Sequence, residues 1–167
     1  MNVYVNMNMK TNDKVRRVIE ILRATGRDGV EKVIDYLLSS SYFTRDCYGH
    51  HKERGSKTKG TTGGLVAHSL EVYDYMREHA VGLPADSIAV AALFHDLGKT
   101  RASDGRGHGR RSLDILDECG FTLTADERTA IGTHHKHYHT YVTCPLRRLL
   151  SDGDCDSTGR WKRAHHR

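Results

Sequence analysis

Apolar residues recur at intervals of three and four along most of this chain, the spacing that places them on one face of an α-helix. Val15, Val18 and Leu22 show it within residues 13–24, and residues 30–38 repeat the same pattern. A glycine-containing turn separates the two segments and breaks the helical pattern. We therefore expect two helices that form a packing layer and carry no catalytic residue.

The middle of the chain predicts a helix over 65–80, which the chain enters through Gly63 and Gly64. The next segment, 87–97, is apolar on nearly every side, which is typical of a buried central helix. It ends in His95 and Asp96, so we expect that helix to deliver both side chains into the interior. A buried carboxylate needs a cation or several hydrogen-bond donors, which makes Asp96 informative by itself.

The last third predicts three more helices. One covers 111–118, with His108 at its start. Another opens at the capping box Thr124-Ala125-Asp126-Glu127, and the last begins at Pro145. No convincing alternation of β-forming residues follows residue 12, so the predicted fold class is all-α, a compact single-domain bundle of about six or seven helices.

Three stretches fall outside this helical pattern. Residues 1–12 read as an N-terminal tail or an added strand, and residues 159–167 as a basic C-terminal tail, leaving 13–158 as the domain. Within it, residues 39–64 form an irregular basic loop, rich in serine, glycine and lysine. Lys57 and Lys59 of this loop are candidate phosphate contacts, and a merely solvated basic loop explains them about as well.

Composition narrows the classes of function. A chain of 167 residues fits one domain, and its net charge of +5 favours anionic ligands such as nucleotides without establishing a nucleic-acid-binding protein. No apolar run approaches the roughly 20 residues that span a bilayer, so we expect a cytoplasmic protein that does not engage membranes. The four cysteines are irregularly spaced and predict no disulfide framework. The oligomeric state is left open.

Histidine is the unusual residue, with 12 in the chain. Imidazole and carboxylate together are typical ligands of Zn, Fe, Mn or Ni, with Mg as an alternative when oxygen ligands dominate. The inward-facing candidates are too many for one tetrahedral ion and suit two ions about 3.5–4 Å apart, bridged by Asp96 and a water. These candidate metal ligands are His68, His95, Asp96, His108, His134, His135 and Asp152.

A hydrolytic metal site also needs a cation for the phosphoryl oxygens. Lys99 lies three residues after Asp96 and is placed for this role, with Arg101 and Arg111 as helpers. Asp96 and Lys99 are therefore the two candidate catalytic residues, and a nucleotide-type phosphate ester is the expected substrate.

The pattern resembles the HD-domain metal-dependent phosphohydrolase superfamily. The resemblance lies in the segment 63–72 around His68, in Leu93-Phe94-His95-Asp96-Leu97-Gly98-Lys99, in Gly107-His108-Gly109, in His134-His135 and in Ser151-Asp152. It implies an all-helical fold and hydrolysis of phosphomonoesters or phosphodiesters, usually of nucleotides.

The same resemblance implies a role for each residue. His68, His95, Asp96 and Asp152 resemble the ligands of a first metal, and Asp96 would bridge to a second. His108, His134 and His135 resemble the ligands of that second metal, and Lys99 resembles a phosphate-contacting lysine. Asp154 is a rival to Asp152, which we prefer because it directly follows the Leu149-Leu150 pair, as the motif aspartate usually does.

Two other classes of function remain open. One is a non-catalytic metal- and nucleotide-binding regulatory protein, against which the complete ligand set and Lys99 both argue. The other is a nuclease acting on RNA or single-stranded DNA through the basic loop and tail. Few aromatic residues interleave those charges, so nucleic acid is the less favoured partner.

Overall fold

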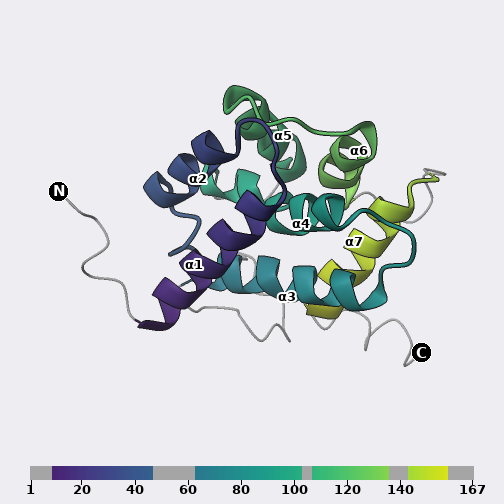
Figure 1. Cartoon of the computed structure of the whole chain (residues 1–167), viewed down its shortest axis with the longest axis horizontal. Coiled ribbons are helices and arrows are strands. Elements are labelled where there is room, and N and C mark those ends of the chain that lie inside the picture. The colour runs from purple at the N-terminus through teal and green to yellow at the C-terminus, as the bar shows by residue number, and fades with distance from the viewer. Residues whose placement is uncertain (1–8, 47–62, 103–106, 136–142, 158–167) are drawn as a thin grey trace.

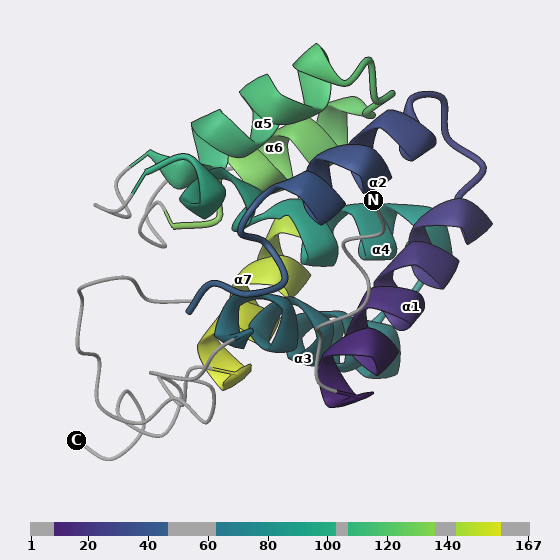
Figure 2. The ribbon, with the colours of Figure 1, turned by 90° about the vertical axis from the view of Figure 1, so that its left-hand side faces the viewer.

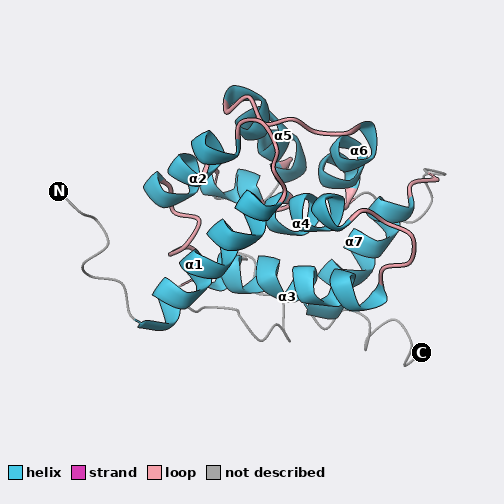
Figure 3. Ribbon diagram, in the orientation of Figure 1, coloured by secondary structure: helices cyan, strands magenta, loops and turns pink. Residues whose placement is uncertain are grey.

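The computed structural model describes residues 9–46, 63–102, 107–135 and 143–157, and every regular element among them is a helix (Figure 3). The all-α prediction is confirmed. None of these helices combines the length and apolar character needed to cross a bilayer. The elements are α1 (Met9–Ala24), α2 (Val30–Ser39), α3 (Gly64–His79), α4 (Ala85–Phe94), the 3₁₀ helix η2 (Leu97–Thr100), α5 (His108–Glu118), α6 (Ala125–Thr133) and α7 (Pro145–Ser157).

Helix α4 lies at the centre of the arrangement. It contacts α1, α3, α6, α7 and η2. In Figure 1 α3 runs below it while α5 and α6 lie above, and the view turned by 90° in Figure 2 places α1 and α2 along one side. The helix pairs in most extensive contact are α3 with α4, α3 with α7, α5 with η2, and α6 with both α7 and α5.

The position of α4 explains why its sequence is apolar on every side. Its residues are buried without a break from Ser87 to Phe94. Val90, Leu93 and Phe94 join a cluster built with α1, α2, α3 and α5. Ile88, Ala89, Ala91 and Ala92 join a second cluster with α3 and α7. A helix that contributes to two apolar clusters has no face left for solvent, as its sequence predicts.

Several helix boundaries differ from the sequence-based prediction, including the start of α5, which begins at His108 and not at Arg111. Helix α1 begins at Met9, so the tail predicted over 1–12 is helical at its end. Helix α4 stops at Phe94, three residues early, and the chain turns through His95 and Asp96 before η2. The reason is tertiary, because a Cβ on Gly98 would lie 2.1 Å from the carbonyl oxygen of His108. The chain must turn there to let η2 pack against the start of α5.

The ends of the irregular basic loop are held together. The amide of Gly63 donates to the carbonyl of Thr44 at 3.0 Å, and the amide of Leu65 donates to that of Arg45 at 2.9 Å. Gly63 has a φ of 78°, a conformation that favours glycine, and it forms the N-cap of α3. Residues 47–62, with Lys57 and Lys59, lie outside the described residues, as does the tail over 159–167.

A buried ionic network joins the N-terminal ends of α4 and α6. The Glu127 side chain has no exposed surface and pairs with Arg27 at 2.7 Å. It also accepts hydrogen bonds from the Ser87 hydroxyl at 2.6 Å and from the Thr124 amide at 2.8 Å. Arg27 pairs in addition with the part-exposed Asp86 at 2.6 Å. Burial opposes ionisation of Glu127, but its hydrogen bonds from Arg27 and Ser87 hold its pKa below the usual 4.5.

Replacing Glu127 with alanine should destabilise the fold by about 3–5 kcal/mol, since it leaves a largely buried guanidinium with one weaker partner. Because the folded-state pKa of Glu127 is lowered, its stabilisation is present above pH 4.5 and is lost as the pH falls further. Urea unfolding at pH 7 and at pH 4 measures both effects. Asp86→Asn is the matched control and should cost about 1 kcal/mol or less; equal losses for the two variants would contradict this account.

Candidate metal centre

Most of the predicted ligand side chains come together at one place in the interior. Helix α3 contributes His68, and the turn after α4 contributes His95 and Asp96. Helix α5 begins with His108, and α6 is followed by His134 and His135. All but His135 are buried. These residues form two groups that could each hold a metal ion, one of His68, His95 and Asp96 and one of Asp96, His108, His134 and His135.

Asp96 is the residue that the two groups share, and its two oxygens face different imidazoles. Its Oδ2 atom lies 3.5 Å from Nε2 of both His68 and His95. Its Oδ1 atom lies 2.9 Å from Nε2 of His108 and 3.7 Å from Nε2 of His134. None of these contacts gives Oδ1 a well-aligned hydrogen bond from the described residues. The two oxygens of one buried carboxylate therefore face two separate sets of imidazole nitrogen atoms.

Two of the histidines are oriented by the helices that they follow. The Nδ1–H of His95 donates to the carbonyl of Ala92 at 2.8 Å, and that of His134 donates to the carbonyl of Ile131 at 2.8 Å. Both acceptors are carbonyls that a helix leaves unpaired in its last turn. Because the proton is on Nδ1, each Nε2 presents a lone pair to the centre.

His68 is oriented by a relay from another helix. The Ser157 hydroxyl on α7 donates to Oε2 of Glu71 at 2.5 Å, so its oxygen accepts from Nδ1 of His68 at 3.0 Å. That leaves the Nε2 lone pair of His68 facing the centre as well. Carboxylates that orient a ligating histidine through its second nitrogen are typical of metal sites.

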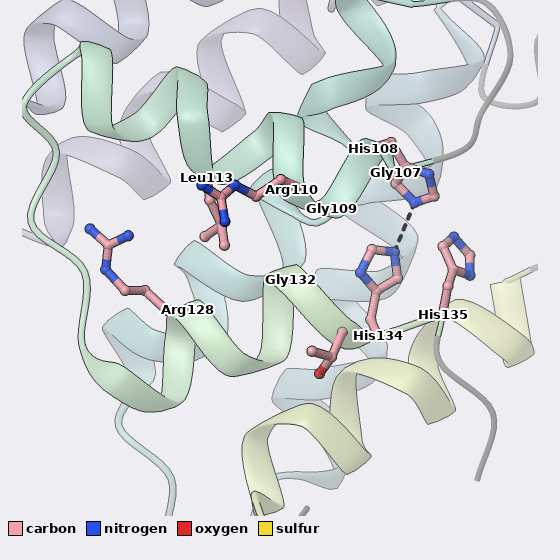
Figure 4. A pocket seen from close by; sticks show the side chains of 10 residues that line it. Gly107, His108, Gly109, Arg110, Leu113, Arg128, Gly132, His134 and His135 are labelled. Atoms are coloured by element: carbon pink, nitrogen blue, oxygen red, sulfur yellow. Dashed lines mark hydrogen bonds between the residues drawn. The ribbon is translucent and has the colours of Figure 1, made fainter. Parts of the chain in front are cut away.

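The resulting arrangement fits a cation. Nε2 of His68 and Nε2 of His95 lie 3.1 Å apart, and both carry lone pairs. Burial lowers the pKa of His95 to about 3, so this ring is neutral at neutral pH. A metal ion bound by His68 and His95 would turn the repulsion of their lone pairs into coordination. His108 and His134 repeat the 3.1 Å approach between their Nε2 atoms (Figure 4).

Electrostatics also keep Asp96 ionised. Burial by itself would raise the pKa of this carboxyl, but Lys99 and the surrounding imidazoles outweigh burial and hold the pKa well below its usual range. Nζ of Lys99 donates to Oδ2 of Asp96 at 2.6 Å. The centre therefore contains an ionised carboxylate, the form that binds a metal ion.

Two glycines let the segments approach closely enough to form the centre. Gly98 permits η2 to contact the start of α5, and its amide donates to the Ser112 hydroxyl at 2.8 Å. A Cβ on Gly109 would lie 2.5 Å from the carbonyl oxygen of Ile131, so only glycine allows α5 to lie this close to α6. These two approaches bring His108 to Asp96 and to His134.

The structure corrects the predicted aspartate on α7. Asp154 is buried, and its Oδ1 lies 3.1 Å from Nε2 of His68 while its Oδ2 lies 4.0 Å from Nδ1 of His135. Asp152 is half-buried and acts electrostatically on Tyr75. Two residues along a helix turn the side chain to the opposite side, and the buried face of α7 continues from Leu150 to Asp154. We therefore place the α7 carboxylate at Asp154 and withdraw Asp152.

The cationic side chains predicted to contact phosphate do not all lie at the centre. Lys99 lies at the centre, and Nε of Arg111 donates to the carbonyl of Gly98 at 3.3 Å, close beside it. Arg101 instead pairs with Glu118 at 2.5 Å and lies over the Tyr36 ring. The described contacts of its guanidinium are thus with Glu118 and Tyr36 and not with the ligands of the centre, so we leave it out of the proposed phosphate contacts. The proposed roles of Lys57 and Lys59 fall outside the described residues.

Sequence patterns did not point to the residues that support the ligands. Ser112, Ser157 and Glu71 carry no metal-ligand signature. Glu71 and Ser112 do have a spacing signal, since Glu71 lies three residues after His68 on α3 and Ser112 lies four residues after His108 on α5. Ser157 reaches His68 from α7, 89 residues away in the sequence, so it had no local signal toward that ligand.

Removing the Ser157 hydroxyl should weaken metal binding about 10- to 100-fold, because His68 loses the group that fixes its tautomer. Titration of Ser157→Ala with Mn²⁺ or Zn²⁺ against a chromophoric chelator measures this directly, without any assay of activity. Ser157→Thr should restore the affinity. Ser151→Ala is the matched control, since its hydroxyl on the same helix donates to the backbone carbonyl of His134. Wild-type affinity in Ser157→Ala would rule out the relay.

Comparison with protein families finds a match to the HD domain over residues 65–162, more than half of the chain. Comparisons with curated proteins and with solved structures find no match. The matched region begins one residue after the start of α3 and contains every histidine and aspartate of the centre. This chain therefore belongs to the HD domain family, within the HD-domain metal-dependent phosphohydrolase superfamily.

Proposed function

We propose that this protein is a metal-dependent phosphohydrolase that cleaves a phosphomonoester or phosphodiester bond of a nucleotide-type substrate. The observation that supports the proposal most is the division of Asp96 between two groups of imidazoles, with Lys99 beside it. In this proposal His68, His95, Asp96 and Asp154 hold one ion, and Asp96, His108, His134 and His135 hold a second. The ions are of the Mn, Fe, Ni or Zn type, with Mg as an alternative.

Metal ions held by these residues would supply a water of lowered pKa and positive charge for the phosphoryl oxygens. In hydrolysis the water oxygen bonds to phosphorus, the bond to the leaving oxygen breaks, and the proton of the water ends on that leaving group. Asp96 holds the two sets of ligands in one geometry. Lys99 supplies a fixed ammonium group at the edge of the centre, where negative charge develops in the transition state.

The nucleotide-type substrate is supported by the charge around the centre. Lys99 and Arg111 flank Gly98 on the side of Asp96, and the whole chain carries a net charge of +5. Both features favour an anionic ligand.

The regulatory alternative and the nuclease alternative predict different results from this proposal. The regulatory alternative predicts nucleotide binding without turnover, and the nuclease alternative predicts turnover of long single strands.

Substitution of Asp96 by asparagine should abolish metal-dependent hydrolysis, because the shared ligand loses its charge. Lys99→Ala should lower kcat by about 10²–10³-fold, the effect of removing one group that stabilises developing charge. The assay uses the metal-loaded protein with bis(p-nitrophenyl) phosphate, p-nitrophenyl phosphate and a panel of nucleotides.

Arg101→Ala is the matched control for Lys99→Ala, since it removes a neighbouring cation that pairs with Glu118 outside the centre. Metal analysis of each variant separates loss of an ion from loss of chemistry. Undiminished activity in Asp96→Asn would refute the proposal. Nucleotide binding by the wild type, with no turnover of any ester, would favour the regulatory alternative instead.

A further inference from the structure

A groove of about 460 Å³ runs from the candidate metal centre along the crease between α5 and α6 (Figure 4). One end is formed by His108, His134 and His135, which belong to the centre. The other end lies between Arg110 on α5 and Arg128 on α6. The size falls within the range of small-molecule sites, roughly 300–1,000 Å³, so the groove suits a unit of nucleotide size.

The wall between the two ends has few bulky side chains. Gly109 and Gly132 line it from opposite helices, and Figure 4 shows them between the histidines and the two arginines. A Cβ on Gly132 would come within 3.1 Å of Leu113, the apolar side chain of the lining. Gly132 and Leu113 are only half-buried, and Leu113 adds an apolar surface, so this part of the wall can lie against a planar ring or a sugar.

The far end of the groove is cationic. Its lining contains Arg110 and Arg128 but no carboxylate. The arginines pair with Asp114 at 3.0 Å and with Asp117 at 2.5 Å, and both pairs are exposed. Exposed pairs of this kind contribute little, so a phosphate group with its stronger charge-assisted hydrogen bonds can replace the aspartates as partner.

The spacing of the two ends sets the length of the ligand. Arg128 lies six residues before His134, which corresponds to about 9 Å along α6 at the helical rise of 1.5 Å per residue. A ligand with one phosphate at the centre and a second anionic group at Arg128 is thus about one nucleotide unit long.

Building on the proposed function, we propose that this groove is a second substrate subsite. It takes the nucleotide unit next to the scissile phosphate and binds a terminal phosphate of that unit through Arg128, with Arg110 beside it. The substrate class is then a short phosphodiester with a terminal phosphate, such as a phosphorylated dinucleotide, in preference to an unphosphorylated one.

The test compares substrates that share the scissile bond and differ in the terminal phosphate. These are the dinucleoside monophosphate ApA and its phosphorylated forms pApA and ApAp. For the metal-loaded wild type, we expect KM for one phosphorylated form to be about tenfold lower than KM for ApA, the effect of one hydrogen bond to a charged group. In Arg128→Ala that ratio should fall close to one, through KM and with little change in kcat.

Arg16→Ala is the matched control, because Arg16 is also exposed and pairs with an aspartate, Asp13 at 2.9 Å, on the distant α1. It should retain the wild-type ratio. A wild type that cleaves bis(p-nitrophenyl) phosphate but shows no preference for a terminal phosphate would overturn the subsite and keep the proposed function. An equal loss of the ratio in both arginine variants would also overturn it.

Calorimetric binding of pApA and ApAp separates the subsite from the chemistry. Suppose that the wild type cleaves no ester, yet binds a phosphorylated dinucleotide more tightly than Arg128→Ala does. The proposed function then fails and the subsite stands. If Arg128→Ala binds as tightly as the wild type, the subsite fails.

Discussion

The structure depends on keeping one negative charge in its interior. Asp96 has almost no exposed surface, and an ionised carboxylate in such a place needs positive charge or donors around it. Lys99 supplies an ammonium group from the same turn. The imidazoles supply further nitrogen atoms from three other segments, each with its lone pair fixed by a hydrogen bond behind the ring wherever that bond is described. The two groups of ligands around the carboxylate could each hold a metal ion, which would add further positive charge.

Helix α4 holds this charge in place because it is anchored at both ends. Its N-terminal end meets α6 through the buried network of Arg27 and Glu127, and the turn after its C-terminal end meets α6 again through Asp96 and His134. The first turn of α6 and the residue just after its last turn are therefore both held against α4 or the turn that follows α4. Both attachments are polar and lie at the ends of an apolar helix, and the interior between them is made of closely packed apolar side chains.

Close backbone approach is the second requirement of the centre. Gly98, Gly109 and Gly153 each adjoin or lie near a candidate ligand, and a Cβ at any of them would press on a neighbouring element. The groove between α5 and α6 has the same origin. Gly109 and Gly132 let α5 and α6 pack closely, and the groove lined by both glycines lies beside the histidines that this packing brings together.

The sequence by itself determined the helical fold, the burial of α4 and most of the candidate ligands. These follow from local chemistry, since apolar periodicity predicts a buried face and a histidine in register with it points inward. The tertiary structure alone decided the rest. It selected Asp154 over Asp152, because only the packing of α7 on α3 shows which side of that helix faces His68. It directed Arg101 to Glu118 and Tyr36, and it brought Ser157 and Ser112 to the ligands. These outcomes depend on distances between segments far apart in the chain, which no local spacing encodes.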